Sequence, residues 1–204
     1  MSNIITEDVL NETISFEEYL QLTTDIVEEK IPRAGIYTND NTFRYIGSNL
    51  ERMKKVLDTI VLNQKLYNLL AELEENWIWL LISEPWCGDA SWETPALYML
   101  SSASDKIDFR IVLRDTHMEI MKNYQTVGTD SIPKLICLCK NDLKELGTWG
   151  PRPKELHEMV LKFRAEPDFD YRDSVRKLHA WYEADMTKST QEEIIDCVKK
   201  WKTM

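Results

Sequence analysis

Residues 77–90 read Trp77-Ile78-Trp79-Leu80-Leu81-Ile82-Ser83-Glu84-Pro85-Trp86-Cys87-Gly88-Asp89-Ala90. The first six side chains are aromatic or aliphatic without alternation, and the run is too short for a helix, so it predicts a strand buried on both faces. A turn containing Pro85 follows, and Cys87 then comes at the expected start of a helix. The stretch therefore predicts a strand-to-helix junction that carries a single thiol.

The chain after this junction alternates between strand-like and helix-like segments. We expect helices over 91–101 and 115–124 and strands over 107–113, 135–139 and 143–149, an order typical of an α/β layer closed by an antiparallel pair. Lys140-Asn141-Asp142 is the expected hairpin turn. Apolar spacing then predicts helices over 156–163, 171–184 and 191–201, with Ser189 or Thr190 as the cap of the last one.

The segment before Trp77 is predicted to be mostly helical. Two pairs of residues have the spacing of a capping box, Ser15 with Glu18 and Ser48 with Glu51, and apolar residues at helical spacing follow each pair. A loop is expected between them over 31–41, and Asn63 interrupts the second helical region. We therefore expect helices to precede the first strand of the sheet.

Composition excludes several classes of protein. The 204 residues carry a formal charge of −10, which disfavours binding to nucleic acid. The longest apolar run falls far short of the roughly 20 residues of a membrane-spanning helix, and eight acidic residues precede the first basic one, Lys30, which argues against a secretory signal. Four irregularly spaced cysteines fit a reducing cytoplasm. We expect no membrane association, no metal site and no cofactor.

The reactivity of Cys87 is left open by its neighbours. A helix start favours the thiolate by about 0.3 to 1 kcal/mol, whereas the Asp89 carboxylate, ~8 Å away at an effective dielectric of ~40, opposes it by about 1 kcal/mol. The two effects nearly cancel, so the pKa of Cys87 is not determined at this level.

Four features in order resemble the thioredoxin superfamily. Trp86-Cys87-Gly88 is similar to the start of the Trp-Cys-Gly-Pro-Cys loop, and Pro95 falls where thioredoxins kink the following helix. Ile132-Pro133 resembles the Ile-Pro pair whose cis bond lies beside the reactive cysteine, and Lys140-Asn141-Asp142 resembles the Lys-Asn-Gly turn. The resemblance implies a thioredoxin fold, with a central mixed sheet and flanking helices, and helical extensions at both ends of the chain.

A narrower resemblance covers three segments, 82–90, 131–136 and 147–153. They look like a little-described group of bacterial thioredoxin family proteins with Cys-Gly-Asp-Cys or Cys-Gly-Asp-Ala loops. The likeness implies a division into an N-terminal helical extension (1–75), a thioredoxin-like core (76–165) and a C-terminal helical extension (166–204), which together form one compact domain.

Two departures from ordinary thioredoxin limit the function that the resemblance implies. The second loop cysteine is Ala90, and the buried acid six residues before the first cysteine is Leu81. What remains is a thiol–disulfide oxidoreductase without a resolving cysteine, in which Cys87 exchanges with a protein disulfide or a low-molecular-weight thiol. The alternatives are a non-catalytic module that binds a peptide or protein, and a thiol-based redox sensor.

The candidate site therefore combines a thiol, its loop and a groove. Cys87 is the candidate catalytic residue, Trp86, Gly88, Asp89 and Ala90 form its loop, and Ile132 and Pro133 form the substrate groove. Other conspicuous residues are better interpreted as structural, namely Cys137 and Cys139 on one strand face, Cys197, and the three scattered histidines. Trp149 and Arg152 fit either a recognition surface or packing.

Overall fold

The computed structural model describes residues 4–31 and 39–204. Its centre is a four-stranded sheet of β1 (Trp77–Ser83), β2 (Ile107–Leu113), β3 (Lys134–Cys139) and β4 (Glu145–Trp149) in the order β2-β1-β3-β4. β1 is parallel to β2 and antiparallel to β3, and β3 is antiparallel to β4. The α/β fold class with a mixed central sheet, predicted from the sequence, is confirmed.

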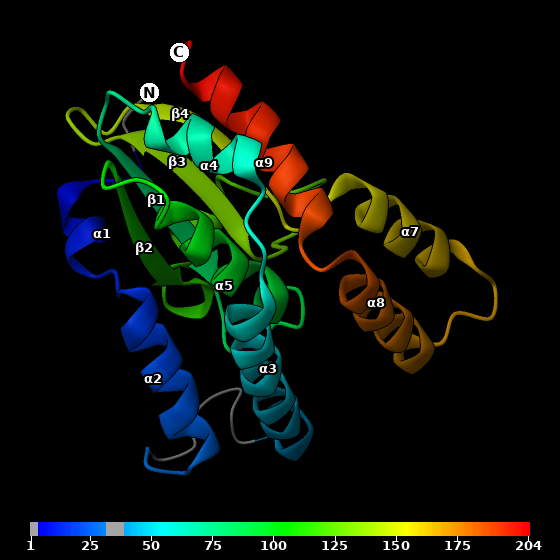
Figure 1. The fold of residues 1–204 in the computed structure, drawn as a ribbon. Helices are drawn as coiled ribbons and strands as arrows, with labels where there is room; N and C mark the ends of the chain where they lie inside the picture. The colour runs from blue at the N-terminus through cyan, green and yellow to red at the C-terminus, as the bar shows by residue number, and fades with distance from the viewer. Residues whose placement is uncertain (1–3, 32–38) are drawn as a thin grey trace.

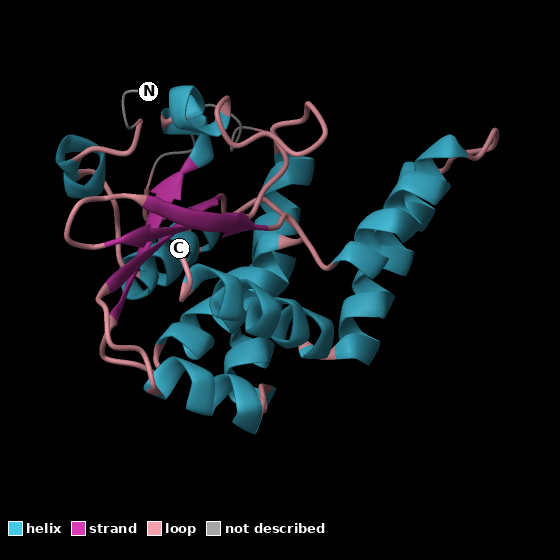
Figure 2. Ribbon diagram, turned by 90° about the horizontal axis from the view of Figure 1, so that it is seen from above, coloured by secondary structure: helices cyan, strands magenta, loops and turns pink. Residues whose placement is uncertain are grey.

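All seven residues of β1 are buried because helices cover both faces of the sheet. Trp77, Trp79 and Leu81 pack into a core formed with α2 (Phe16–Val27), α5 (Ala90–Ser101) and α9 (Lys188–Trp201). Ile78, Leu80 and Ile82 pack on the opposite face, beside α1 (Glu7–Asn11) and α6 (Met118–Met121). Figure 2 shows helices on both sides of the twisted sheet. The unbroken apolar run in the sequence reflects this burial on two faces.

The remaining helices extend the core at both ends of the chain. They are α3 (Asp40–Thr59), α4 (Gln64–Ala71), α7 (Lys154–Ala165) and α8 (Tyr171–Asp185), whereas the short 3-10 helix η2 (Arg114–Thr116) lies within the core, between β2 and α6. α7 and α8 lie side by side and project away from the sheet, whereas α9 returns along β4 and packs against α4 (Figure 1). The helical extensions expected from the sequence are therefore present.

The expected cap at Ser15 is confirmed. The Ser15 hydroxyl accepts from the Glu18 amide at 3.1 Å, and the Glu18 carboxylate accepts from the Ser15 amide at 2.7 Å. Asn63 caps α4 through its side-chain oxygen, which accepts from the Lys65 amide at 2.9 Å. The interruption predicted at Asn63 therefore separates two helices.

The prediction that a helix starts at Ser48 is wrong. α3 begins eight residues earlier, at Asp40, and the Ser48 hydroxyl donates to the Arg44 carbonyl inside it. The side chain of Asn39 accepts from the Thr42 amide at the true start. The helix extends upstream because its apolar face does, with Ile46 fully buried. The expected loop over 31–41 is thus helical from Asp40, and its residues 32–38 lie outside the described ranges.

Two other boundaries differ from the prediction. The helix expected over 115–124 is reduced to η2 and the single turn of α6. α9 begins at Lys188, so Ser189 and Thr190 lie inside it and do not cap it. The Thr190 hydroxyl instead donates to the buried carboxyl group of Glu93 in α5. A contact between distant segments has therefore replaced the local cap that the sequence pattern indicates.

Candidate functional site

Cys87 lies in the turn between β1 and α5, directly beside the Ile132-Pro133 bond. Its amide donates to the Glu84 carbonyl at 3.1 Å, and its own carbonyl accepts from the Ser91 amide at 3.2 Å. The thiol donates to the Ile132 carbonyl, with Sγ and O separated by 3.3 Å, and the Ile132-Pro133 peptide bond is cis. The fold thus brings the predicted loop and the predicted groove together.

The Cys87 thiol is shielded from solvent, with only 8% of the residue exposed. Burial, with a further contribution from the Asp89 carboxylate, raises the pKa of Cys87 to about 12, although the amides of Ala90 and Asp89 and the Arg152 charge oppose the rise. The thiol is therefore protonated at neutral pH. Desolvation therefore decides the pKa of Cys87, which the opposing effects of the helix start and of Asp89 left undetermined.

Asp89 forms a buried ion pair that sequence inspection missed. The Arg152 guanidinium contacts both carboxylate oxygens, with Nε–Oδ1 at 2.9 Å and Nη2–Oδ2 at 2.5 Å, and the Tyr182 hydroxyl donates to Oδ1 at 2.8 Å. Burial alone would lower the pKa of Arg152, but the adjacent carboxylate raises it above its usual value. Asp89 makes no side-chain hydrogen bond as a helix cap. The bidentate pair with Arg152 instead ties the cysteine loop to the segment before α7, and the hydrogen bond from Tyr182 ties it to α8.

The next turn of α5 carries a second set of buried polar contacts. Glu93 is 1% exposed, and the Thr190 hydroxyl donates to its carboxyl group at 2.9 Å. Burial raises the pKa of Glu93 well above its usual value, which favours the protonated form of this side chain. The Trp92 indole donates to Nδ1 of His179 at 3.0 Å and stacks on Tyr182. Helices α8 and α9 are therefore joined to α5 immediately after the cysteine loop.

Trp86 is held in place at the edge of the loop. Its indole N–H donates to an Asp115 carboxylate oxygen at 3.2 Å, and the Arg114 guanidinium lies 4.5 Å from the centre of its ring. The half-buried ring is thus positioned by a hydrogen bond and a cation–π contact. One part of it lines a hollow beside Cys87.

We call this feature the α8 hollow. It has a volume of about 170 Å³ and lies between the cysteine loop and the α7–α8 pair, with Trp86, Gly88, Tyr45, Phe169, Tyr171 and His179 among its lining residues. Gly88 allows close contact with α8, because a Cβ there would lie 3.2 Å from Cε1 of His179. Aromatic side chains thus surround a concave surface next to the loop.

The residues that sequence inspection interpreted as structural occupy core or packing positions. Cys137 is buried and burial raises the pKa of its thiol, while burial raises the pKa of Cys197 to about 11. All four cysteines are free. The Trp149 indole donates to Glu193 at 2.8 Å, so Trp149, like Arg152, is engaged in packing. Two of the three histidines differ, since His179 borders the α8 hollow and His157 borders a second concave surface beside β4.

Comparisons with known proteins agree with this architecture. A family model described as Thioredoxin matches residues 35–170. No curated protein matches the sequence. A solved protein of unknown function from Pseudomonas aeruginosa, PA1234, is similar with a TM-score of 0.61 at 16% identity, over 98% of this chain and 97% of that one. An HIV epitope scaffold is similar with a TM-score of 0.53 at 17% identity, over 94% of this chain and 99% of the scaffold. Both similarities concern the fold.

Proposed function

The chain belongs to the thioredoxin family, and on that premise we propose that it is a non-catalytic binding module that holds an extended segment of a partner protein in the groove of Trp86, Cys87, Ile132 and Pro133. The segment would lie against the cis-proline and contact the protonated Cys87 thiol without a covalent step. An extended ligand can satisfy its backbone groups in such a groove, while neighbouring pockets select its side chains.

The observation that carries this proposal is the state of the Cys87 thiol. Burial raises the pKa of Cys87 to about 12, so the thiolate is a very small fraction of the protein at pH 7. An ordinary cysteine with a pKa of about 8.5 has about 3% thiolate at that pH. Since the thiolate is the attacking species in disulfide exchange, the resting protein is better suited to contact a partner than to attack it. Ala90 at the position of the resolving cysteine likewise favours binding over disulfide exchange.

The α8 hollow supports selective binding. It adjoins Trp86 and Gly88, so a side chain of the bound segment would meet the aromatic surface of Tyr45, Phe169 and Tyr171. These three aromatic side chains are between 39% and 63% exposed. Aromatic residues around a concave surface are typical of sites that anchor a partner. The ligand that we expect is therefore an extended peptide with a bulky apolar residue.

Monothiol exchange is the second candidate, and one feature favours it. The amides of Asp89 and Ala90 stabilise negative charge on the Cys87 sulfur, as does Arg152. In this reaction the Cys87 thiolate would attack one sulfur of a protein disulfide, and the other partner sulfur would leave as a thiolate. An external low-molecular-weight thiolate would then attack the partner sulfur of the mixed disulfide and release Cys87. This route, or oxidation of Cys87 as a sensor, is what the resemblance to the Cys-Gly-Asp-Ala group suggests.

We further propose that the protein acts in the cytoplasm, where its four free cysteines would stay reduced. Within residues 4–31 and 39–204, no helix combines the length and the apolar character needed to cross a bilayer. The partner would then be another cytoplasmic protein that presents an extended segment.

A peptide-binding experiment separates the two candidates. A library of unstructured peptides is screened against the full chain, and the affinity of the best binder is measured by fluorescence anisotropy for three variants. Cys87→Ser is expected to bind within about threefold of the wild type, whereas Trp86→Ala weakens binding about tenfold or more because it removes an aromatic anchor. Tyr67→Ala, on the exposed part of α4, is the control and leaves affinity unchanged.

The outcomes decide between binding and exchange. Formation of a mixed disulfide at Cys87 with an oxidised small thiol at pH 7, together with loss of partner capture in Cys87→Ser, would establish exchange in place of simple binding. If no peptide in the library binds, or if Trp86→Ala binds the best peptide as tightly as Tyr67→Ala does, the groove is not a binding site.

A further inference from the structure

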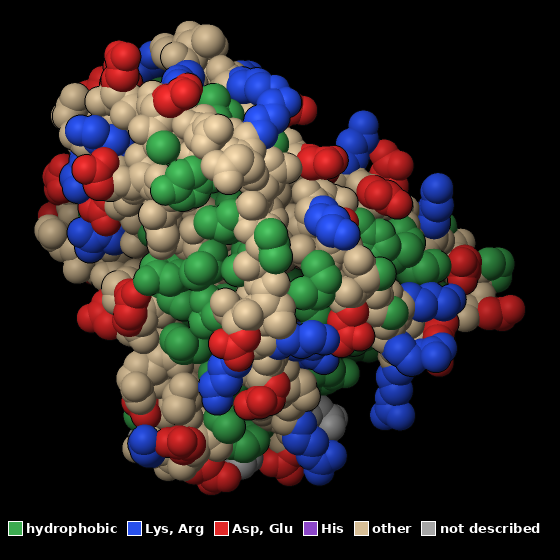
Figure 3. Space-filling model, in the orientation of Figure 1, with side chains coloured by type: hydrophobic (Ala, Val, Ile, Leu, Met, Phe, Trp, Pro, Cys, Tyr) green, Lys and Arg blue, Asp and Glu red, His purple; other side chains and the backbone are tan. Residues whose placement is uncertain are grey.

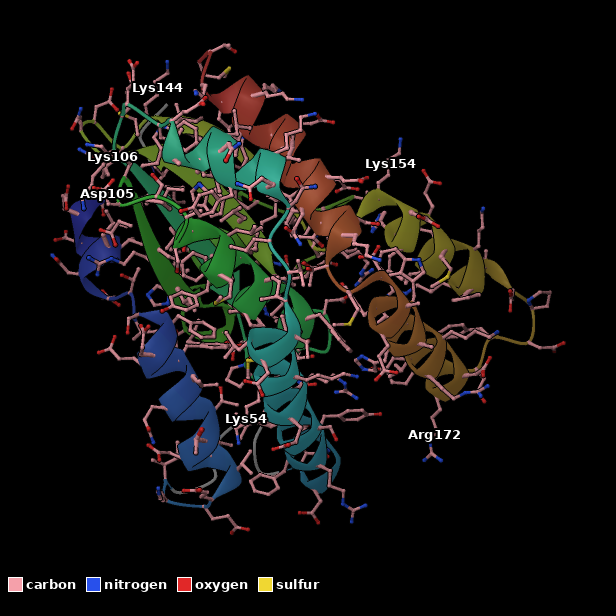
Figure 4. The ribbon with its side chains drawn as sticks, in the orientation of Figure 1. Lys54, Asp105, Lys106, Lys144, Lys154 and Arg172 are labelled. Atoms are coloured by element: carbon pink, nitrogen blue, oxygen red, sulfur yellow. The ribbon has the colours of Figure 1, made fainter. Side chains whose placement is uncertain are left out.

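A second concave surface lies at the edge strand β4 and the first turn of α7. We call it the β4 hollow. It has a volume of about 290 Å³, and its lining includes Lys134, Arg152, Lys154, His157, Thr126 and Glu193. Lys154 lies at the start of α7 (Figure 4). Arg152 borders this hollow as well as the α8 hollow, so the two surfaces meet at one side chain.

The positive charge of the β4 hollow is not balanced by the residues around it. Arg152 is neutralised by Asp89. Glu193 is the acid in the lining, and it already accepts from the Trp149 indole at 2.8 Å and from the Lys154 amide at 2.7 Å. Within the described parts of the chain, neither Lys134 nor Lys154 forms an ion pair. Lys134 and Lys154 carry two positive charges against the one negative charge of Glu193, which leaves an excess of one positive charge in a chain whose net charge is −10.

Lys134 is the strongest single indication. Only 9% of the residue is exposed, and its ammonium donates to the Thr126 hydroxyl at 3.3 Å. An ammonium has three N–H donors, and burial without hydrogen-bonding partners is costly. Burial lowers the pKa of Lys134, and the negative charge of Glu145 opposes this shift. The Glu145 carboxylate accepts a hydrogen bond from the Tyr124 hydroxyl. This lysine therefore has donors to spare at the floor of the hollow.

His157 adds a second unsatisfied group. Its Nδ1 is buried and has no hydrogen-bond partner among the described residues. Buried polar atoms are satisfied in the large majority of cases, so an exception calls for a missing partner. Lys134 of β3, which has donors to spare, and His157 of α7 thus line the same hollow, and a ligand with several acceptor oxygens would suit Lys134.

We propose that the β4 hollow binds a small oxyanion, a phosphate or a carboxylate, whose oxygens accept from the ammonium groups of Lys134 and Lys154. An oxyanion supplies both the acceptors and the negative charge that the surrounding residues lack. This proposal does not depend on the peptide-binding function, because it rests on different residues and on a different observation.

Charge elsewhere on the surface is arranged differently. On the face shown in Figure 3, acidic side chains and those of lysine and arginine are intermixed. Exposed lysines elsewhere include some that are paired with an acid, such as Lys55, whose ammonium lies 3.4 Å from a Glu183 carboxylate oxygen. The β4 hollow differs from such surface pairs because its buried lysine donates to a hydroxyl and, within residues 4–31 and 39–204, has no carboxylate within ion-pair distance.

Thermal unfolding of the full chain tests the proposal. The melting temperature is measured in sodium phosphate, sodium acetate and sodium chloride at equal ionic strength. Phosphate or acetate at ten times its dissociation constant is expected to raise Tm by about 3 to 6 °C over chloride. A rise with phosphate alone identifies a phosphate site, and a rise with acetate identifies a carboxylate site.

Two variants make the test specific. Lys134→Met keeps the length of the side chain and removes the buried charge, so it is expected to fold and to lose the anion-dependent rise in Tm. Lys162→Met, at an exposed position on α7 outside the hollow, is expected to keep it. The proposal is overturned if chloride raises Tm as much as the oxyanions do, or if Lys134→Met retains the full effect.

Discussion

Replacing Asp89 by asparagine should make the Cys87 thiol more acidic. The carboxylate is one cause of the raised pKa of Cys87, and its removal also leaves the Arg152 charge unpaired, which favours the thiolate further. A unit charge ~8 Å away, at an effective dielectric of ~20 to 40, is worth about 1 to 2 kcal/mol. Loss of the Asp89 charge should therefore lower the pKa of Cys87 by about 1, which leaves the thiol mostly protonated at pH 7.

Alkylation by iodoacetamide measures this change. Modification at each cysteine is quantified by mass spectrometry between pH 7 and pH 10. For the wild type, the rate at Cys87 is expected to rise about tenfold per pH unit without a plateau, since the pKa of about 12 lies above the whole range. Asp89→Asn is expected to be about three- to fourfold faster at every pH, because more thiolate is present but each thiolate is somewhat less nucleophilic. Labelling of the buried Cys137 in the same samples reports unfolding.

A second variant controls for damage to the fold. Asp89→Asn breaks a buried pair and is expected to cost about 3 to 5 kcal/mol of stability. Asp89→Asn combined with Arg152→Gln removes both charges, so its rate at Cys87 should return to within about twofold of the wild type. A plateau at or below pH 9 in the wild-type profile would refute the claim that burial controls the thiol. Equal rates in the wild type and Asp89→Asn would refute the role of the carboxylate.

Three further predictions concern stability. Glu93→Gln is expected to become more stable relative to the wild type as the pH rises from 5 to 8. Burial raises the pKa of Glu93, so the wild-type carboxyl group gives stability that is present below pH 4.5 and is lost as the pH rises through the folded-state value. Urea unfolding at both pH values checks this, and a difference between the two proteins that is the same at pH 5 and pH 8 would contradict it. Burial lowers the pKa of His179 to about 4, so the neutral imidazole contributes stability that is present above pH 6.5 and is lost as the pH falls from 6.5 toward 4. His179→Gln should therefore lose less stability than the wild type over that interval. Identical profiles of unfolding free energy against pH in the two proteins would count against this prediction. Gly147→Ala is expected to lower the free energy of unfolding by about 2 to 4 kcal/mol, because φ at Gly147 is 154° and a Cβ would lie 2.2 Å from Nε1 of Trp201. Gly47→Ala, with open space around it, is the control and should be neutral or slightly stabilising in the same thermal melts. Similar losses of stability in the two variants would argue against the close contact.

Local patterns were sufficient for the centre of the fold. A run of apolar residues too short for a helix predicts β1, because a strand covered on both faces needs no polar alternation. The capping residues Ser15 and Asn63 and the hairpin at Lys140-Asn141-Asp142 are equally local, since each acts on backbone groups within a few residues. The same kind of pattern failed at Ser48, where a longer apolar face extended the helix across it.

The chemistry around Cys87 was decided by contacts between distant segments. Asp89 pairs with Arg152 across 63 residues and with Tyr182 across 93, and Glu93 meets Thr190 across 97. Sequence alone places a lone cysteine at a strand-to-helix junction and a proline opposite it. Only the tertiary structure determines the burial of that thiol, because the free energy of ionisation depends on the solvent and charges that distant segments exclude or supply.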